Sequence, residues 1–255
     1  MAKRHIEREF GVPIAGEILE PQKWTRTGLK RLPSEGPIRW QNLFGRDAPI
    51  VLDLGCGNGR FLIGSAVWRP HHDHFGIDWL PVVIRYATRR GNQRGLTNLR
   101  FAVGDARQLL RSCVDSHSVT EIHCYHPQPY YDPEQVHQRL VTPEFLALVH
   151  RGLVPGGQFF LQTDNPGYWR YMTQVAPLFF DFEERTATWP DAPKGRTRRE
   201  IVALRRGLPV FRGLGTARRG LSEADAIRLA DTMPPPVFDA DRRLLELDEE
   251  ERHHG

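Results

Sequence analysis

The sequence predicts an α/β fold in which helices cover both faces of a mostly parallel β-sheet. Short apolar runs alternate with longer stretches of helical periodicity from residue 50 onward, which is the pattern of repeated β-α-β units. Several of the helical stretches carry a proline near their first turn, where the missing N–H group costs little. With 255 residues, the chain is long enough for one large core of this kind.

The elements follow in chain order from the apolar runs and the breaks between them. The apolar runs predict parallel strands at residues 50–54, 74–77, 99–103, 119–124 and 158–162. The stretches between them predict helices at residues 58–68, 81–94, 134–151 and 166–178. Two later runs, at residues 183–189 and 200–205, are predicted to form an antiparallel hairpin at one edge of the sheet. A seven-stranded sheet results.

The segments on either side of these elements differ from them in composition. Residues 1–49 contain many glycine, proline and charged residues without periodicity, so we expect an irregular basic arm. Residues 50–213 form the predicted domain, and residues 214–255 are predicted to be a partly disordered tail with an acidic run at 246–251. The run Pro234-Pro235-Pro236 marks the expected end of ordered structure. Basic residues collect in the arm and again late in the domain, which suits a polyanionic partner.

Composition and motif content favour a cytoplasmic protein. The first residues are too charged for a secretory signal, and no run of about 18 apolar residues occurs. Cys56, Cys113 and Cys124 lack metal-ligand spacing and fit a reducing compartment. The histidines at residues 71–74 are consecutive and point in different directions, so we expect no metal site. We also expect no membrane partner and a monomeric protein.

A glycine-rich loop follows the first predicted strand. The chain reads Asp53-Leu54-Gly55-Cys56-Gly57-Asn58-Gly59 at this point. Gly55 and Gly57 lack a Cβ, so the backbone can pass close under a bulky ligand. The spacing excludes the P-loop of nucleoside triphosphatases and does not match the dinucleotide fingerprint G-x-G-x-x-G. A ligand with an amino-acid end fits this loop better.

Two acids follow the next two strands. Asp78 can accept hydrogen bonds from both ribose hydroxyls of an adenosine, and Asp105 with the backbone amide of Ala106 can bind the adenine edge. Each acid could instead cap the helix that follows it. Together with the glycine loop they lie at the carboxyl ends of neighbouring parallel strands and share one crevice. The arrangement resembles the Rossmann-like class I methyltransferases, whose cofactor is S-adenosylmethionine.

A more specific resemblance runs from about Trp40 to about Arg212. Its motifs are Leu43-Phe44-Gly45, Gly76-Ile77-Asp78, Leu96-Thr97-Asn98-Leu99-Arg100, His126-Pro127-Gln128-Pro129-Tyr130, Arg139-Leu140-Val141, Thr163-Asp164 and Thr197-Arg198-Arg199-Glu200. In these motifs the chain is similar to the bacterial tRNA (guanine-N7)-methyltransferases. The resemblance implies an enzyme that uses S-adenosylmethionine to form N7-methylguanosine in its partner, tRNA.

The resemblance also implies a role for each residue that matches a family motif. Asp53, Asp78 and Asp105 would bind the cofactor. Gln128 and Asp164 would be the catalytic pair, and with Thr197 and Glu200 they would surround the target base. Tyr130 would stack on a base, whereas Arg139, Arg198 and Arg199 would contact phosphate. On local grounds, Asp164 could instead cap the helix that starts at Pro166, and Tyr130 could belong to the core.

The chain departs from the family in one motif. The family reads F-P-D-P-W followed by basic residues, whereas this chain has Gln128, Tyr130 and an acidic segment at 132–135. Guanine N7 already carries a lone pair, so methyl transfer needs no general base and depends on holding N7 in line. A carboxylate matches two N–H donors of guanine, whereas Gln128 offers one acceptor and one donor. We therefore expect Gln128 to hold guanine less selectively.

Two other functions remain open from the sequence. The segment Pro127-Gln128-Pro129-Tyr130 loosely resembles the N-P-P-Y motif of enzymes that methylate exocyclic amines, although it lacks adjacent prolines. Alternatively, the chain could be a catalytically impaired, cofactor-binding partner of RNA, as Gln128 suggests. The glycine loop and the cofactor acids argue against complete loss of the cofactor site.

Overall fold

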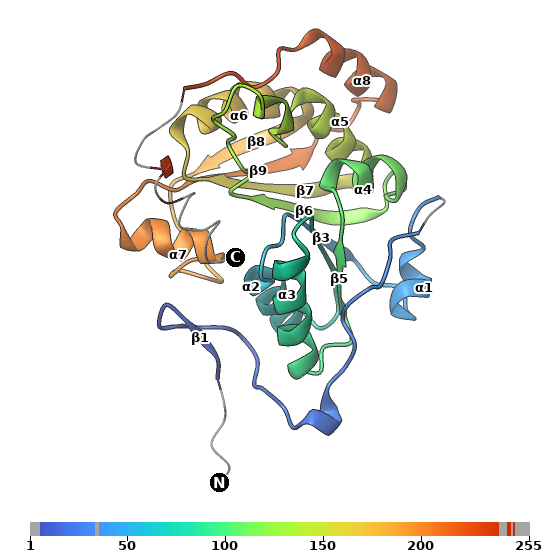
Figure 1. The fold of residues 1–255 in the computed structure, drawn as a ribbon. Coiled ribbons are helices and arrows are strands. Elements are labelled where there is room, and N and C mark those ends of the chain that lie inside the picture. The colour runs from blue at the N-terminus through green and yellow to red at the C-terminus, as the bar shows by residue number, and fades with distance from the viewer. Residues whose placement is uncertain (1–5, 34–35, 240–243, 246, 248–255) are drawn as a thin grey trace.

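A computed structural model describes residues 6–33, 36–239, 244–245 and 247 of the chain. A seven-stranded sheet with the order β5-β4-β3-β6-β7-β9-β8 forms its centre (Figure 1). The strands are β3 (Ile50–Leu54), β4 (Asp73–Asp78), β5 (Leu99–Val103), β6 (Val119–Tyr125), β7 (Leu153–Thr163), β8 (Phe180–Arg185) and β9 (Phe211–Ala217). Strands β3 to β7 are parallel, whereas β9 is antiparallel to both β7 and β8. The predicted α/β class with an antiparallel edge is confirmed.

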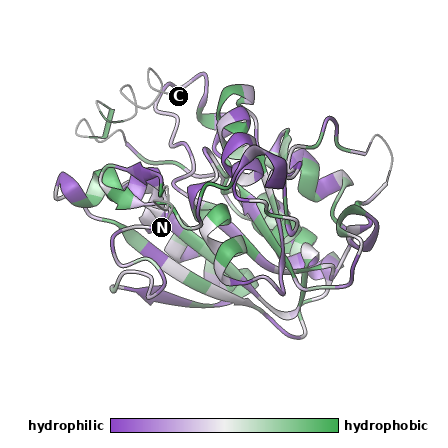
Figure 2. Ribbon diagram, turned by 90° about the horizontal axis from the view of Figure 1, so that it is seen from below, coloured by the Kyte–Doolittle hydropathy of each residue, from purple (hydrophilic) through white to green (hydrophobic). Residues whose placement is uncertain are grey.

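Helices cover both faces of the sheet. On one face lie α2 (Arg60–Trp68) and α3 (Pro81–Gln93), and on the other lie α4 (Ala106–Ser112), α5 (Pro143–Gly152) and α6 (Pro166–Phe179) (Figure 1). A further helix, α8 (Glu223–Thr232), packs against α5. Every residue of β3 is buried, as expected for a central strand covered on both faces. Figure 2 shows hydrophobic residues along the inner strands, and both hydrophobic and hydrophilic residues on the helices and on the strands at the edge.

The prediction is wrong about the second strand of the edge hairpin. Residues 200–205 belong to helix α7 (Arg198–Arg205), and β9 is the strand that lies between β7 and β8. The Thr197 hydroxyl accepts a hydrogen bond from Glu200 N at 3.1 Å, which is the start of a capped helix. This cap and the burial of Ile201 on one side of α7 outweigh the strand-like composition of the segment. Strand β9 also continues past residue 213, where we placed the end of the domain.

Other predicted bounds move because prolines and caps decide where helices begin. The helix expected at 134–151 starts only at Pro143. The Thr142 hydroxyl caps it by accepting a hydrogen bond from the backbone N–H of Phe145. The earlier part of the predicted range contains a short 3-10 turn, η2 (Val136–Gln138). Neither α4 nor α8 was predicted.

The basic arm is not irregular throughout its described part. It contains an antiparallel pair of short strands, β1 (Arg8–Glu9) and β2 (Val12–Pro13), a 3-10 turn, η1 (Pro21–Lys23), and a short helix, α1 (Trp40–Phe44). Apart from Leu247, the acidic run at 246–251 lies outside the described residues. No helix among the described residues is long and apolar enough to cross a membrane.

Candidate functional site

The glycine loop and Asp78 form one hydrogen-bonded unit at the carboxyl ends of β3 and β4. Asp78 Oδ2 accepts from the backbone N–H of Gly57 at 3.0 Å, and Oδ1 accepts from that of Leu80 at 3.0 Å. The parallel pairing of β3 with β4 and of β4 with β5 brings Asp53, Asp78 and Asp105 to the same end of the sheet. We call these three side chains the cofactor acids.

The glycines of the loop serve two different purposes. Gly55 and Gly57 have φ values of 82° and 51°, and a Cβ added to either would meet no atom within 4 Å. A Cβ on Gly59, in contrast, would lie 2.8 Å from the Phe101 ring and 2.9 Å from Ala87. Gly59 is therefore required by packing, whereas Gly55 and Gly57 leave open space above the backbone. Such space suits a bulky ligand that approaches the main chain.

Burial favours the neutral forms of Asp53 and Asp78, and a positively charged ligand beside them would favour their ionised forms. Asp53 is only 2% exposed, and burial, followed by the neighbouring Asp78 charge, raises its pKa to about 8 despite the opposing charge of Arg196. The pKa of Asp78 is also raised, because the effect of burial outweighs that of the hydrogen bonds from backbone N–H groups. S-adenosylmethionine carries a sulfonium and an ammonium group. The carboxyl groups of Asp53 and Asp78 and the glycine loop therefore fit this cofactor.

Asp105 has the capping role that was open from the sequence. Its Oδ1 accepts from the backbone N–H of Gln108 at 2.8 Å and so caps α4, which begins at Ala106. A carboxylate has further lone pairs, so the cap leaves acceptor capacity at this exposed side chain. No group of three or more His, Cys, Asp or Glu side chains is arranged to hold a metal ion within the described ranges.

A second cluster, at the ends of β6 and β7, brings Asp164 and Gln128 together around a small pocket of about 20 Å³. The pocket is lined by His126, Pro127, Gln128, Pro129, Tyr131, Thr163, Asp164, Asn165, Arg199 and Leu244. Asn165, not Asp164, caps α6, because its Oδ1 accepts from Tyr168 N at 2.8 Å. The structure therefore rules out the capping role that Asp164 could have had.

Asp164 is held by two donors. Its Oδ2 accepts from Arg199 Nε at 2.6 Å, and its Oδ1 lies 3.3 Å from His126 Nδ1. Burial would raise the pKa of Asp164, but its contacts with His126 and Arg199 outweigh burial and hold the pKa well below its usual value. An ionised carboxylate thus faces the pocket.

A hydrogen-bonded chain behind Asp164 determines which nitrogen of His126 carries the proton. The Trp189 indole, which can only donate, lies 2.6 Å from Gln162 Oε1, so the Gln162 amide must donate through Nε2. Gln162 Nε2 lies 2.9 Å from His126 Nε2, which is therefore an acceptor. His126 is consequently neutral, carries its proton on Nδ1 and donates it to Asp164. We call Trp189, Gln162 and His126 the orienting chain.

Sequence reasoning missed the orienting chain. Only His126 lies within a motif that was singled out, and its contribution could not be recognised without its partners. His126 has a φ of 50°, which is uncommon for a residue other than glycine. Such conformations are concentrated at functional sites, where surrounding contacts maintain them.

Thr197 and Glu200 build α7 and do not line the pocket. Glu200 is fully buried, pairs with Arg212 at 2.6 Å and accepts from the backbone N–H of Arg196 at 2.7 Å. Through the helix that they start, these residues place Arg199 beside Asp164. Arg198 is half-buried, with its guanidinium 5.5 Å from the Phe10 ring.

The structure contradicts the phosphate contact predicted for Arg139. This side chain is buried, and its guanidinium donates to the carbonyl oxygens of Pro129 at 2.6 Å, Pro236 at 2.7 Å and Tyr130 at 3.0 Å. It also lies 3.6 Å from the centre of the Phe238 ring. Arg139 therefore holds the pocket segment against residues 236–238, so ordered structure continues past the proline run. Arg199 is likewise buried, against Asp164.

Tyr130 does not line the pocket, and the charges of two cofactor acids act on its hydroxyl. It is half-buried, and burial raises the pKa of its hydroxyl, on which the charges of Arg107, Asp105 and Asp78 also act. Its neighbour Tyr131 lines the pocket and accepts a hydrogen bond from Asn165 Nδ2 at 2.6 Å. Among the described tyrosines, Tyr131 is therefore the one that lines the pocket.

Comparison with known proteins shows which family the chain resembles. A family model described as "Putative methyltransferase" matches residues 47–212. The tRNA (guanine-N(7)-)-methyltransferase of Alcanivorax borkumensis is 32% identical over 75% of this chain and 79% of its own length. That of Halorhodospira halophila is 32% identical over 72% of this chain and 81% of its own length. The chain belongs to the tRNA (guanine-N7)-methyltransferase family.

A solved structure supports the fold. The 16S rRNA methyltransferase KamB superposes with a TM-score of 0.56 at 18% identity, covering 76% of this chain and 99% of KamB. Of the residues in which this chain departs from the motif F-P-D-P-W, Gln128 lines the pocket. His126, two positions before Gln128, belongs to the orienting chain and donates to Asp164.

Proposed function

We propose that this chain methylates N7 of a guanosine in tRNA with S-adenosylmethionine as the methyl donor, and that Asp164 holds the base. Membership of the tRNA (guanine-N7)-methyltransferase family supports the reaction. The observation that carries the site assignment is an ionised carboxylate with two hydrogen-bond donors, at the ends of β6 and β7 and at the same edge of the sheet as the cofactor acids.

The cofactor would be held by residues on β3, β4 and β5. Asp78 accepts from the ribose hydroxyls, Asp105 and the Ala106 amide bind the adenine edge, and Asp53 stabilises positive charge. Gly55 and Gly57 leave the backbone accessible beneath the ligand. When bound, S-adenosylmethionine supplies an electrophilic methyl group.

The target base would be held by Asp164 and Gln128. Each oxygen of Asp164 keeps a lone pair after accepting from His126 and Arg199, so the carboxylate can accept from N1–H and the amino group of guanine. Gln128 adds one acceptor and one donor at the pocket rim. Since N7 needs no deprotonation, both residues act by orienting the base. We propose that the protein acts as a monomer in the cytoplasm.

The test is incubation of the purified chain with labelled S-adenosylmethionine and total tRNA, followed by mass spectrometry of the nucleosides. We expect N7-methylguanosine, with formation lost in Asp164→Ala and cofactor affinity reduced in Asp78→Ala. Asp181→Ala is the control, because this acid is exposed on β8, away from both clusters. Label on protein or small molecules with none on RNA would contradict the proposal.

Gln128 favours a second candidate, methylation of an exocyclic amine. Its acceptor and donor lie side by side and match a base edge that also alternates donor and acceptor, such as that of adenine. The same mass spectrometry separates the two functions, because N6-methyladenosine would appear in place of N7-methylguanosine. Cofactor binding without transfer to any tRNA would identify a catalytically impaired RNA partner.

A further inference from the structure

A groove of about 470 Å³ lies between the N-terminal arm and α3, separate from the pocket at Asp164. Backbone hydrogen bonds fix the arm against the edge strand β5. Leu29 N donates to Phe101 O at 2.8 Å, and Phe101 N donates to Thr27 O at 2.7 Å. The wall that the arm contributes is therefore part of the fold.

The floor of the groove is apolar and includes an exposed aromatic ring. Leu29 and Ile84 lie within it, and Val103 is 43% exposed although it ends a strand of the core sheet. Trp24 is also 43% exposed, and its Nε1 donates to Leu19 O at 2.8 Å. Because this bond already uses the polar atom of the indole, the ring offers the groove a flat apolar face of fixed orientation.

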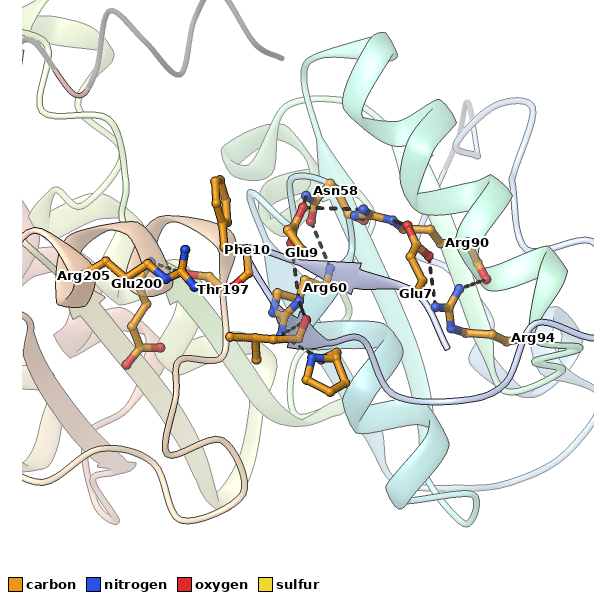
Figure 3. Close-up of polar contacts among 12 residues, drawn as sticks. Glu7, Glu9, Phe10, Asn58, Arg60, Arg90, Arg94, Thr197, Glu200 and Arg205 are labelled. Atoms are coloured by element: carbon orange, nitrogen blue, oxygen red, sulfur yellow. Dashed lines mark hydrogen bonds and ion pairs between the residues drawn. The ribbon is translucent and has the colours of Figure 1, made fainter. Parts of the chain in front are cut away.

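The rim of the groove carries unneutralised positive charge. Lys30, Arg85 and Arg89 are exposed, and none of them forms an ion pair with another residue in the described part of the chain. Arg85 and Arg89 lie one turn apart on the same side of α3. The other side of that helix differs, because Arg90 and Arg94 pair with Glu7 of the arm at 2.9 Å and 3.0 Å (Figure 3). Among the described residues, Glu7 therefore neutralises Arg90 and Arg94 but forms no ion pair with Arg85 or Arg89.

The groove starts beside the cofactor acids. Helix α3 begins at Pro81, directly after Asp78-Trp79-Leu80, and Val103 precedes Gly104-Asp105. The pocket at Asp164 lies at the ends of β6 and β7, on the other side of β3 in the sheet order. A ligand that reaches both places must be extended, as a polynucleotide is.

We infer that this groove binds a single-stranded or looped segment of the tRNA substrate, away from the guanosine that is methylated. A base stacks on Trp24 above the apolar floor, and Lys30, Arg85 and Arg89 contact the phosphates. Nucleotides combine a flat apolar face with a negative charge, which is the combination that this groove offers. The inference rests on the proposed function, since it takes tRNA as the substrate.

The test measures tRNA affinity of the full-length protein as a function of salt concentration. For single strands, each lost phosphate contact lowers the slope of log K against log salt by about 0.7, so Arg85→Ala with Arg89→Ala lowers it by about 1.4. Trp24→Ala weakens binding by between about 5-fold and 150-fold, and Trp24→Phe restores most of the affinity because it keeps a stacking ring. Arg170→Ala is the matched control for charge, because Arg170 is exposed on α6, and this variant keeps the wild-type slope.

Two readouts separate this inference from the proposed function. In the groove variants the loss appears in KM for tRNA, while the Kd for S-adenosylmethionine and the melting temperature stay at the wild-type values. If the wild type methylates tRNA but the double variant keeps its affinity and salt slope, the groove does not bind RNA and the proposed function stands. If the wild type methylates no tRNA, both fail. A loss of slope in Arg170→Ala equal to that of the double variant would also overturn the inference.

Discussion

Replacing Trp189 with Phe removes the donor that determines the orientation of the Gln162 amide. Trp189 is 3% exposed and Gln162 is fully buried, so the Gln162 carbonyl loses its partner without gaining water. An unsatisfied buried acceptor costs about 1–3 kcal/mol of stability. The new ring still packs against Phe160, whose centre lies 5.5 Å from that of Trp189, which limits the loss of packing.

The loss extends along the orienting chain to Asp164. Without Trp189, the Gln162 amide can turn its oxygen toward His126 Nε2, which must then carry the proton. The neutral ring no longer donates from Nδ1, so Asp164 keeps only Arg199. A hydrogen bond to a charged group contributes about 1.5–3 kcal/mol, which corresponds to a reduction of kcat/KM for tRNA by about 10-fold to 150-fold.

Nitrogen-detected NMR of the histidine rings reports the tautomer directly, alongside kcat/KM and urea unfolding. We expect the Nδ1–H form of His126 in the wild type and the Nε2–H form in Trp189→Phe. Trp169→Phe is the matched control, because this buried indole donates to Glu184 at 2.9 Å and has no link to Asp164. It should lose stability and keep its activity. An Nε2–H ring in the wild type, or full activity in Trp189→Phe, would refute the reasoning.

Three further predictions follow from the charges and contacts of single residues. Asp53 keeps its proton up to about pH 8 in the folded chain but only to about pH 4 when unfolded, so folded-state stability falls as pH rises between these values. Urea unfolding should therefore show Asp53→Asn gaining stability relative to the wild type from pH 4 to pH 8, and an unchanged difference would contradict the raised pKa. Arg139→Met should lower the free energy of unfolding by about 2–4 kcal/mol, because several backbone carbonyls lose their donor. If Arg139 were instead a surface residue that contacts phosphate, the substitution would change the free energy of unfolding by no more than about 0.5 kcal/mol. Gln128→Asp should raise the single-turnover rate of guanosine methylation in tRNA by about tenfold, because the second acceptor matches the two N–H donors of guanine. If the rate does not rise, Gln128 does not contact the target base.

The grouping of the glycine loop with Asp53, Asp78 and Asp105 at one end of the sheet was predictable, because its signals are local. An apolar run long enough for one buried strand, followed at once by glycines or an acid, places that residue at a strand end. The parallel order of consecutive strands then brings Asp53, Asp78 and Asp105 together. Gly55 and Gly57 have positive φ angles where the loop leaves β3, and glycine adopts such angles without strain. The open space over their backbone is therefore also consistent with the glycine pattern in the sequence.

The roles that only the tertiary structure decided belong to side chains whose partners are distant in the chain. The sequence predicts Arg139 at the surface, in contact with phosphate. Its guanidinium instead donates to the carbonyl oxygen of Pro236, 97 positions away, and this contact buries the side chain. Residues 200–205 have the composition of a strand, but a helix cap and the burial of Ile201 and Ala203 make them part of α7. The tautomer of His126 depends on Trp189 and Gln162, which meet it only because β6, β7 and the segment after β8 converge. Burial and hydrogen-bond partners are set by packing between elements, and no pattern within a short stretch of sequence contains them.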